Sequence, residues 1–429
     1  MSIRQNSGVP FFRPAIADNE IREVISVLRS GWLTTGPKTT QFEKDFASLV
    51  GARHAVAVNS CTAALHLAVE ALGLEHGHAV LVPTMTFAAT AEVVRYCGAF
   101  PILVDCDAGT LNIDLEDAER KLTSMGERLP YNGNSEPRPV GIMPVHVGGL
   151  MADIRALRAF ATRHSLWMVE DAAHAFPAAW RMNETEAWQQ CGEHTADVSC
   201  FSFYANKTIT TGEGGMAVTD DAELEERIRL MSLHGLSKAA WSRYSTDGSW
   251  DYRILAPGYK YNMTDIAAAI GIHQAARAEE MRKDREKVAY RYINAFGSTA
   301  EMELPPVDTN RIHSWHLFPI KLRLDTLDID RDAFIQLLKL RGVGCSVHWR
   351  PLHLHPYYQK MFGWQPEDCP RATEVWERLV SLPIFPDMTE REMKYVVSVV
   401  KELCQKHSKL PVKSTKTAPL ASRPSSVNL

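Results

Sequence analysis

The sequence contains no pair of cysteines in the CxxC spacing that is typical of zinc sites and redox motifs. Its eight cysteines are scattered along the chain, at Cys61, Cys97, Cys106, Cys191, Cys200, Cys345, Cys369 and Cys404. This scatter argues against a disulfide framework and indicates a reduced compartment with buried thiols. We therefore predict free cysteines and no metal site.

Long apolar runs are missing as well. The amino terminus, MSIRQNSGVPFFRP, has no stretch of the signal-peptide type, and no other segment has the length and apolarity of a membrane span. An excess of charge of one sign is also absent, because 47 basic residues face 51 acidic ones and leave a net charge of −4. This balance argues against nucleic acid or an anionic membrane as a partner. We expect a cytoplasmic protein that acts on small molecules, without membrane insertion.

What the sequence does contain is an alternation of short apolar runs with amphipathic stretches. The apolar runs predict strands at 54–58, 79–82, 101–105, 141–146, 167–170 and 198–203. Helical periodicity lies between several of them, at 62–73, 88–97 and 152–164. The alternation predicts an α/β fold whose mostly parallel sheet is covered by helices on both faces. In such sheets ligands bind at the carboxyl ends of the strands.

Two amphipathic helices precede the first strand, at about 18–31 and 41–50. The apolar residues of the first follow helical spacing, at Ile21, Val24, Ile25 and Leu28. In the second, the residues that share one face are Phe42, Phe46 and Leu49. Two later stretches, 124–139 and 177–196, are predicted as unusually long polar loops, either functional or mere surface excursions.

Past about residue 265 the pattern changes to that of an α+β unit. We predict helices at 265–283, at 331–341 and from 390 onward, the last with a capping box of Thr389 and Glu392. Strands are expected at 316–321 and 343–347. We assign residues 1–264 to a large α/β domain, 265–408 to a smaller α+β domain and 409–429 to a disordered tail.

Polar residues gather where the predicted strands end. Residues 59–63 follow the first strand and begin a helix. These residues would form either an ordinary helix cap or a phosphate site. Phe87 follows the next strand and would either belong to the core or stack on a flat ring. Asp171 ends a buried strand, where a carboxylate is costly unless it pairs with a cation. It would form an internal salt bridge, cap the following turn, or face a protonated pyridine nitrogen.

The stretch SFYANKTITTGEGG, residues 202–215, places Lys207 in a polar turn that ends in glycines. Taken alone, it would be a solvated cation or an amine that forms a Schiff base with a cofactor. A phosphate site, a stacking aromatic ring, an anion for a ring nitrogen and an amine are together the parts that pyridoxal phosphate requires.

Six motifs occur in an order that resembles the DegT/DnrJ/EryC1/StrS family of sugar aminotransferases, which have the fold-type-I architecture of pyridoxal-phosphate enzymes. They are GWLTTGP (31–37), VEDAAHA (169–175), SFYANKTITTGEGG (202–215), PGYKYNMTD (257–265), HSWHLF (313–318) and SLPIFPDMT (381–389). The similarity extends from about Phe11 to Glu402. The branches that the sequence resembles are GDP-perosamine synthase and the enzyme that makes UDP-4-amino-4-deoxyarabinose, both of which aminate a 4-keto sugar nucleotide.

The resemblance implies roles for individual residues. The expected catalytic residues are Lys207, Asp171 and His174. The expected cofactor-binding residues are Cys61, Thr62, Ala63, Phe87, Asp171, His174, Ser202, Lys207 and, from the neighbouring subunit, Asn262. The expected substrate-binding residues are Thr34, Thr35, His316, His348 and Trp349. The resemblance also implies a homodimer with shared active sites, although a helix cap is an alternative role for Asn262.

We predict a pyridoxal-phosphate-dependent aminotransferase that moves an amino group from glutamate to C4 of a nucleotide-linked 4-keto sugar. A sugar 3-aminotransferase or dehydratase on the same fold is one alternative, although the dehydratases compared have histidine where this chain has Lys207. A non-catalytic binding relative is another, but it would be expected to lose Lys207 or Asp171. His353 and His355 would share a face of an extended strand, yet no carboxylate or cysteine lies close in sequence to complete a metal site.

Overall fold

The computed structural model describes residues 8–124, 137–237 and 252–411. The predicted tail lies outside these residues from position 412 onward, and the predicted loop at 124–139 lies outside them at 125–136. No helix within the described ranges combines the length and the apolarity needed to cross a membrane.

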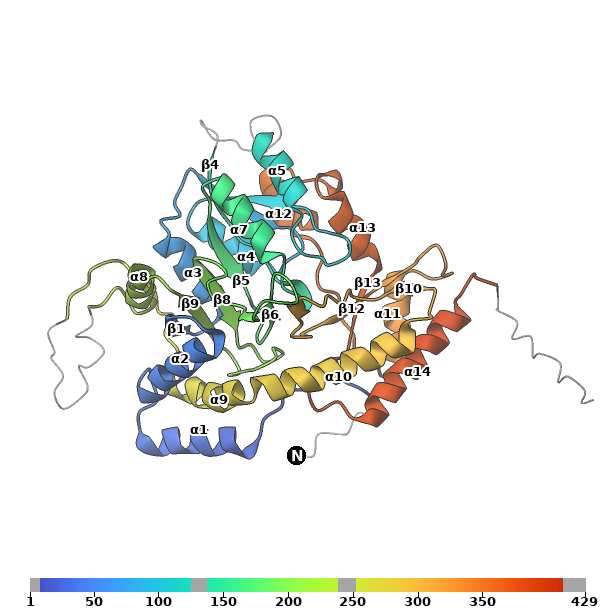
Figure 1. The fold of residues 1–429 in the computed structure, drawn as a ribbon, viewed down its shortest axis with the longest axis horizontal. Helices are drawn as coiled ribbons and strands as arrows, with labels where there is room; N and C mark the ends of the chain where they lie inside the picture. Colours follow the sequence, from blue (N-terminus) through green and yellow to red (C-terminus); the bar gives the residue numbers. More distant parts are fainter. Residues whose placement is uncertain (1–7, 125–136, 238–251, 412–429) are drawn as a thin grey trace, which may run out of the picture.

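The centre of the molecule is a seven-stranded sheet with the order β1-β9-β8-β5-β4-β2-β3 (Figure 1). Its strands in chain order are β1 (His54–Val58), β2 (His78–Pro83), β3 (Phe100–Val104), β4 (Arg138–Ile142), β5 (Trp167–Asp171), β8 (Val198–Ser202) and β9 (Gly215–Thr219). The strands from β3 to β8 pair in parallel, and only β9 runs antiparallel to its neighbours β1 and β8. This mostly parallel sheet confirms the predicted fold class.

The sequence predicted every strand of this sheet except β9, while β4 lies a few residues earlier than expected. β9 begins at Gly215, and glycine is a poor strand former. The glycine is required because a Cβ there would lie 2.4 Å from the carbonyl carbon of Ser60 and 2.5 Å from the nitrogen of Cys61. The start of β9 therefore packs directly against the first turn of the helix that follows β1.

Helices connect the strands and cover the sheet. They are α3 (Cys61–Ala71), α4 (Ala89–Tyr96), α5 (Leu115–Thr123), α7 (Ile154–Arg163) and α8 (Ala222–Ser232). A further group, α1 (Asp18–Ser30), α2 (Pro37–Val50) and α9 (Asp265–Ala276), lies together below the sheet in Figure 1. The helices α3, α4 and α7 begin where the sequence places them, to within two residues.

The predicted apolar face of α1 does not point into the core. Ile21, Ile25 and Leu28 are 50%, 41% and 53% exposed, whereas Glu20 is buried. Glu20 points inward because its carboxylate accepts hydrogen bonds from Gln274 and Arg277 at the end of α9. Helical spacing gave the helix correctly but not the side that is buried. Similarly, Phe42 and Phe46 of α2 are buried while Leu49 is 45% exposed.

The long helix predicted at 265–283 is two helices in the structure. α9 ends at Ala276, and α10 (Ala278–Phe296) begins after Arg277, whose φ of −106° and ψ of 7° interrupt the helix. The side chain of Arg277 bonds to the carbonyl oxygen of Ala15 and to Glu20, which fixes this bend against the segment before α1. In Figure 1, α10 continues along the lower side of the molecule toward α14.

The carboxyl-terminal part has its own hydrophobic cluster around a small antiparallel sheet. The sheet contains β10 (Met302–Glu303), β12 (Phe318–Leu322) and β13 (Leu379–Leu382) in that order, and α11 (Arg331–Leu340) and α14 (Glu390–Lys406) pack beside it. The strand predicted at 343–347 is wrong. Described residues form only isolated bridges there, from Val343 to Val9 and from Ser346 to Ser381. The predicted loop at 177–196 contains β6 (Ala179–Trp180) and β7 (Gln189–Gln190), which form a third sheet with β11 (Arg311–Ile312).

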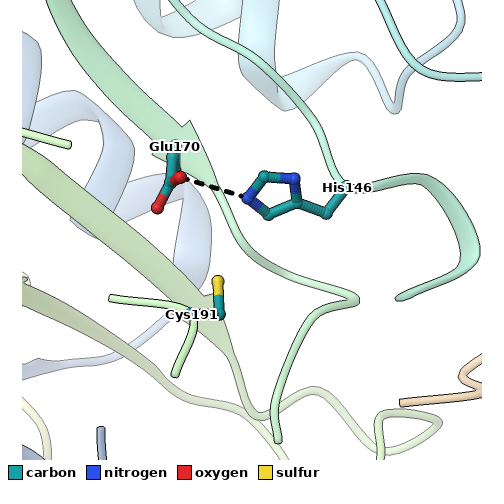
Figure 2. A group of neighbouring side chains, drawn as sticks. All are labelled: His146, Glu170 and Cys191. Atoms are coloured by element: carbon teal, nitrogen blue, oxygen red, sulfur yellow. Dashed lines mark ion pairs between the residues drawn. The ribbon is translucent and has the colours of Figure 1, made fainter. Parts of the chain in front are cut away.

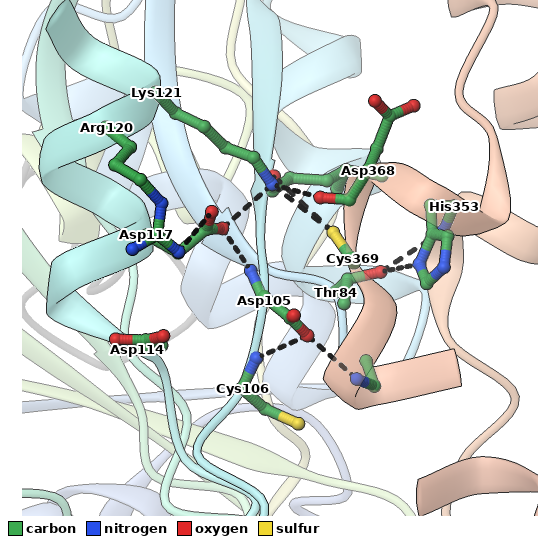
Figure 3. Close-up of polar contacts among 12 residues, drawn as sticks. Thr84, Asp105, Cys106, Asp114, Asp117, Arg120, Lys121, His353, Asp368 and Cys369 are labelled. Atoms are coloured by element: carbon green, nitrogen blue, oxygen red, sulfur yellow. Dashed lines mark hydrogen bonds and ion pairs between the residues drawn. The ribbon is translucent and has the colours of Figure 1, made fainter. Parts of the chain in front are cut away.

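One carboxyl-terminal segment returns to the large sheet (Figure 3). It includes η3 (Leu352–Leu354), α12 (Pro356–Phe362), η4 (Pro366–Asp368) and α13 (Pro370–Arg378). Asp105, at the end of β3, accepts hydrogen bonds from the backbone N–H groups of Arg371 (2.9 Å) and Ala372 (2.8 Å) in the first turn of α13. Leu352 and Phe362 pack in the same hydrophobic cluster as the large sheet. The domain boundary at 264/265 stays a prediction.

Candidate active site

A cavity of about 340 Å³ lies at the carboxyl ends of the strands of the large sheet. Its volume is within the range of small-molecule sites. The sequence-predicted residues that line it are Cys61, Thr62, Phe87, Asp171, His174, Ser202, Lys207, His316, His348 and Trp349. The predicted residues that do not line it are Thr34, Thr35, Ala63 and Asn262. The structure thus brings together most of a site whose parts are dispersed over about 290 positions of sequence, from 61 to 349.

Asp171 is a buried carboxylate fixed by two donors. The hydroxyl of Thr90 donates to Oδ2 at 2.7 Å, and the backbone N–H of Ala173 donates to Oδ1 at 3.1 Å. Burial raises the pKa of Asp171, while these hydrogen bonds and the charge of Lys207 oppose that rise. The sequence gave no sign of Thr90, because a threonine inside a helix carries no motif of its own.

Lys207 lies in the turn between β8 and β9, where its backbone N–H bonds to the carbonyl oxygen of Tyr204. Its amine reaches the cavity and has no hydrogen-bond partner among the described residues. Desolvation lowers the pKa of Lys207 to about 8, against the opposing effect of Asp171. At pH 7 roughly a tenth of the amine is therefore neutral, far more than for an ordinary lysine, and this favours a nucleophilic role.

The first turn of α3 forms one wall of the cavity. The hydroxyl of Ser60 accepts the N–H of Ala63 at 3.1 Å, so the backbone of Ala63 is occupied by the cap. The N–H groups of Cys61 and Thr62 come before the first intrahelical hydrogen bonds and remain for a ligand. This turn can therefore take an anion such as phosphate. Gly215 lets β9 pack directly against the turn, because a Cβ there would clash with the backbone of Ser60 and Cys61.

Three histidines and a tryptophan form the opposite wall. The ring of His174 stacks on Trp349 at 5.0 Å and lies 4.1 Å from the ring of His316. The N–H of Gly148 donates to His174 Nδ1, which leaves the proton of a neutral ring on Nε2. Burial and the charge of Lys207 lower the pKa of His348 to about 4. The pKa values of His174 and His316 lie well below their ordinary range, again mainly through burial.

Asn262, Thr34 and Thr35 lie together outside this cavity. Asn262 Nδ2 donates to Thr35 Oγ1 at 2.7 Å, and Thr35 Oγ1 donates to the carbonyl oxygen of Met263. The carbonyl oxygen of Thr34 accepts the N–H of Asp265 at the start of α9. These residues do not line the cavity of their own chain.

His353 and His355 do not share a face, because the chain forms the short helix η3 there instead of an extended strand. His353 is fully buried and its two ring nitrogens lie 2.7 Å from Thr84 Oγ1 and 2.9 Å from Thr373 Oγ1. His355 lies near the carbonyl oxygen of Arg350. Figure 3 shows the contact of His353 with Thr84, and its two contacts give His353 a structural position.

A buried polar cluster that the sequence did not reveal lies next to the site (Figure 2). His146 Nε2 lies 3.3 Å from Glu170 Oε1, with Cys191 beside them. The N–H of Ala152 donates to His146 Nδ1, so the proton of the neutral ring is on Nε2, directed at Glu170. With its proton on this nitrogen, His146 suits a close pair with Glu170 and not a metal ligand, since a metal would have to displace that proton. The absence of a metal stays a prediction.

This geometry can be compared with that of known proteins. A model of the DegT/DnrJ/EryC1/StrS aminotransferase family matches residues 14–401. The chain belongs to this family. Its activity is that of a sugar aminotransferase, and its cofactor is pyridoxal phosphate.

Individual relatives agree with this result. The spore coat polysaccharide biosynthesis protein SpsC of Bacillus subtilis is 43% identical over 401 residues, which cover 93% of this chain and 98% of SpsC. Among solved structures, the sugar aminotransferase Spr1654 of Streptococcus pneumoniae in its PLP form has a TM-score of 0.81 and 30% identity, covering 93% of this chain and 99% of that one. DesV of S. venezuelae has a TM-score of 0.77 and 30% identity, covering 90% and 95%.

The cavity fits the cofactor of the family. It contains an amine without a hydrogen-bond partner among the described residues, a buried carboxylate, and a helix amino terminus beside a glycine that a Cβ would crowd. These are the three kinds of group that the aldehyde, the ring nitrogen and the phosphate of pyridoxal phosphate need.

Proposed function

We propose that this enzyme transfers an amino group from glutamate to C4 of a nucleotide-linked 4-keto sugar. The observation that carries the proposal is the cavity in which Lys207, Asp171 and the first turn of α3 meet. The sugar-nucleotide substrate is supported by the motifs that resemble the 4-amino branches of the family. The name of SpsC supports a role in building a polysaccharide.

Four side chains would serve the cofactor. When bound, pyridoxal phosphate supplies an aldehyde carbon that takes up the amino group and a ring that accepts electrons. Lys207 Nζ is the amine that anchors it, and Asp171 is the anion that keeps the ring nitrogen protonated. Phe87, with 62% of its side chain exposed, offers an aromatic surface for one face of the ring. The Nε2–H of His174 is a donor for the hydroxyl side of the ring.

The phosphate would be held by the backbone of Cys61 and Thr62 and by Ser202. Ala63 contributes to this site indirectly, because its N–H fixes the Ser60 cap that orients the turn. We therefore propose a supporting role for Ala63 in place of the direct contact that the resemblance implies.

Lys207 would also move protons during the reaction. Because the pKa of its amine is about 8, Lys207 can both accept a proton from the substrate carbon and give a proton back at a pH close to neutral. The neutral imidazoles of His316 and His348, together with the indole of Trp349, form the wall against which the sugar would bind. None of the three carries a charge that would compete with Asp171.

We also propose a homodimer with shared active sites, in which Asn262, Thr34 and Thr35 serve the cavity of the partner subunit. They lie outside their own cavity and are held together by hydrogen bonds. Large apolar side chains such as Ile254 (70% exposed) and Leu255 (61% exposed) provide surface for such an interface. All eight cysteines are free, which suits the cytoplasm.

The proposal is tested by supplying the enzyme with glutamate and a panel of UDP-, GDP- and dTDP-linked keto sugars. The products are analysed by mass spectrometry, and formation of 2-oxoglutarate is measured in parallel. We expect a 4-amino sugar nucleotide from one member of the panel. If only 3-keto sugars were aminated, the enzyme would be a 3-aminotransferase. If glutamate gave no turnover and another amino donor did, the assignment of glutamate as the donor would be wrong.

A further inference from the structure

His316 is a buried histidine whose ring makes no hydrogen bond to the described parts of the chain. It is 3% exposed, and neither Nδ1 nor Nε2 has a partner among the described residues. Buried polar side-chain atoms nearly always have a partner, because an unpaired one destabilises the fold. Since His316 also lines the cavity, its two nitrogens are available to a ligand there.

The other buried histidines show the contrast. Each has at least one hydrogen bond to a described residue, and they are His66, His146, His174, His313 and His353. His313, three positions before His316, accepts the backbone N–H of Trp315 on Nδ1 at 2.8 Å and does not line the cavity. The unpaired ring therefore belongs to the histidine of this segment that faces the cavity.

His316 is held in the cavity wall by its neighbours. Its ring centroid lies 4.1 Å from that of His174, whose Nε2–H we propose as a donor to the cofactor. The backbone of the segment is fixed to the large domain, because the N–H of Leu317 donates to the carbonyl oxygen of Gly148 at 3.1 Å. The ring therefore stands next to the expected place of the cofactor, where the reacting part of a substrate binds.

The protonation state of the ring restricts the kind of ligand. Mainly through burial, the pKa of His316 lies well below its ordinary range, so the ring is neutral at pH 7. A neutral imidazole offers one N–H donor and one acceptor nitrogen. A carboxylate or a keto oxygen only accepts, so it would leave the acceptor nitrogen unpaired. Hydroxyl groups donate as well as accept, and two of them can satisfy both nitrogens.

The two substrates of the proposed reaction differ in these groups. Both must reach the same amine, that of Lys207, and therefore share the cavity. Glutamate carries two carboxylates, and its amine is the group that reacts at the cofactor. A sugar carries hydroxyl groups on neighbouring carbons. The open donor and acceptor of His316 thus match the sugar and not the amino acid.

We propose that His316 is a specificity-determining residue that binds hydroxyl groups of the keto sugar and takes no part in binding glutamate. The inference rests on the proposed function and deepens it, because it names the group by which the cavity recognises one of its two substrates. A site built to bond a hydroxyl group rejects a substrate that lacks it, because the polar group of the protein then stays unpaired.

The test measures the two half-reactions separately with the full-length enzyme and its cofactor. Glutamate is added to the pyridoxal form and a keto sugar to the pyridoxamine form, and single turnovers are followed by absorbance over a range of concentrations. The keto sugar is the member of the UDP-, GDP- and dTDP-linked panel that the wild-type enzyme aminates. In His316→Phe, which keeps an aromatic ring, the half-saturating concentration of this sugar should rise about five- to thirtyfold. That of glutamate should change by less than about twofold.

Analogues of the same sugar that lack the hydroxyl at C2 or at C3 identify the group that is bound. At least one of them should bind the wild-type enzyme about five- to thirtyfold more weakly than the complete sugar. His316→Phe should bind this analogue and the complete sugar equally well, because the interaction is already lost in the variant.

Two controls separate recognition from structure. His313→Phe removes a hydrogen-bonded histidine from the same segment, so it should lower the melting temperature and leave both half-saturating concentrations unchanged. His316→Phe should not lower the melting temperature, because it removes two unpaired polar atoms. His316→Leu replaces it if phenylalanine is too large for the site.

An unchanged affinity for the keto sugar in His316→Phe overturns the inference, and so does an equal loss of affinity for glutamate. An equal loss in His313→Phe, or a lower melting temperature in both His316 variants, also overturns it, because the role would then be structural. If the wild-type enzyme aminates no member of the panel, the proposed function itself is wrong. If it aminates one that His316→Phe binds just as tightly, only the inference about His316 is wrong.

Discussion

The hydroxyl of Thr90 donates a 2.7 Å hydrogen bond to Asp171 Oδ2, and both residues are buried. Removing this donor would leave one oxygen of a buried carboxylate without its partner, which costs about 1.5 to 3 kcal/mol. Since the remaining burial favours the protonated acid, the pKa of Asp171 should rise further. We predict that Thr90→Val lowers kcat by about ten- to a hundredfold while the fold is retained.

The matched control is Thr86→Val. Thr86 Oγ1 lies 2.7 Å from Thr90 Oγ1, one step further from the carboxylate, and it is equally buried. Its substitution should reduce kcat less than that of Thr90. Equal losses in the two variants would show that packing, and not the bond to Asp171, accounts for the effect.

Lys207→Ala should abolish both turnover and covalent attachment of the cofactor. Lys207 Nζ has no hydrogen-bond partner among the described residues, so its removal leaves no described donor or acceptor of the protein unpaired and the fold should persist. Borohydride treatment followed by mass spectrometry should label the wild-type peptide that contains Lys207 and leave the variant unlabelled. Ordinary turnover by the variant would remove Lys207 from the mechanism.

Asp171→Asn should slow both halves of the reaction by several orders of magnitude, because a neutral amide cannot hold the proton on the ring nitrogen. Cofactor should still bind, since the phosphate site at α3 is untouched. Single-turnover measurements with glutamate and with the keto sugar report the two halves separately. A loss below about tenfold in either half, or ~1.4 kcal/mol, would contradict this role.

Shared active sites can be tested with mixed dimers of Lys207→Ala and Asn262→Asp. Homodimers of either variant should be almost inactive, because a carboxylate at position 262 repels phosphate. A mixed dimer has one site with both faults and one with neither, so about half of the wild-type activity per dimer should return. Isolated mixed dimers that remain inactive while both variants are folded would place Asn262 in the site of its own chain.

Glu170→Gln tests the buried pair with His146. Burial alone would raise the pKa of Glu170, but the nearby ring of His146 and the hydrogen bonds from Ser199 and Thr195 outweigh it, and the pKa is lowered. The stabilisation is therefore complete above the ordinary value near 4.5 and is lost as the pH falls through the lowered pKa.

Glu170→Gln should accordingly reduce the free energy of unfolding by about 1.5 to 3 kcal/mol at pH 7, the contribution of hydrogen bonds to a charged group. Denaturant titrations between pH 7 and pH 3 should show this difference shrinking toward the acid end. A difference that stays constant with pH would mean that the charge of Glu170 contributes nothing to stability.

The sequence predicted the parts of this site that stand at strand ends, because parallel strands bring their carboxyl ends to one edge. It did not reveal Thr90 or His146. These residues act through contacts across elements that no local spacing encodes. The face of α1 was missed for a related reason, since Glu20 is buried by pairing with Arg277, some 257 positions away.

A glycine and a proline explain two further differences between the predicted and the observed structure. Gly215 starts β9 where periodicity favoured a turn, and its need for close packing appears only when α3 is placed beside it. His353 was expected on an extended strand, but Pro351 and the cap of η3 turn the chain there. In both cases the expectation from the local pattern was wrong: a tertiary contact decided the conformation at Gly215, and a short helix decided it at His353.

The stretch that carries His348 and Trp349 into the cavity is fastened at both ends. Ser346 exchanges two backbone hydrogen bonds with Ser381 of the small sheet, and the N–H of Leu352 bonds to the carbonyl oxygen of Thr84 beside the large sheet. This wall is ordered before a substrate arrives, so binding spends little conformational entropy on it. A sugar with a larger substituent would clash with this fixed surface and would not bind. Broadening the range of sugars that the enzyme accepts would therefore require substitutions in this wall, because greater flexibility of the segment would not remove the clash.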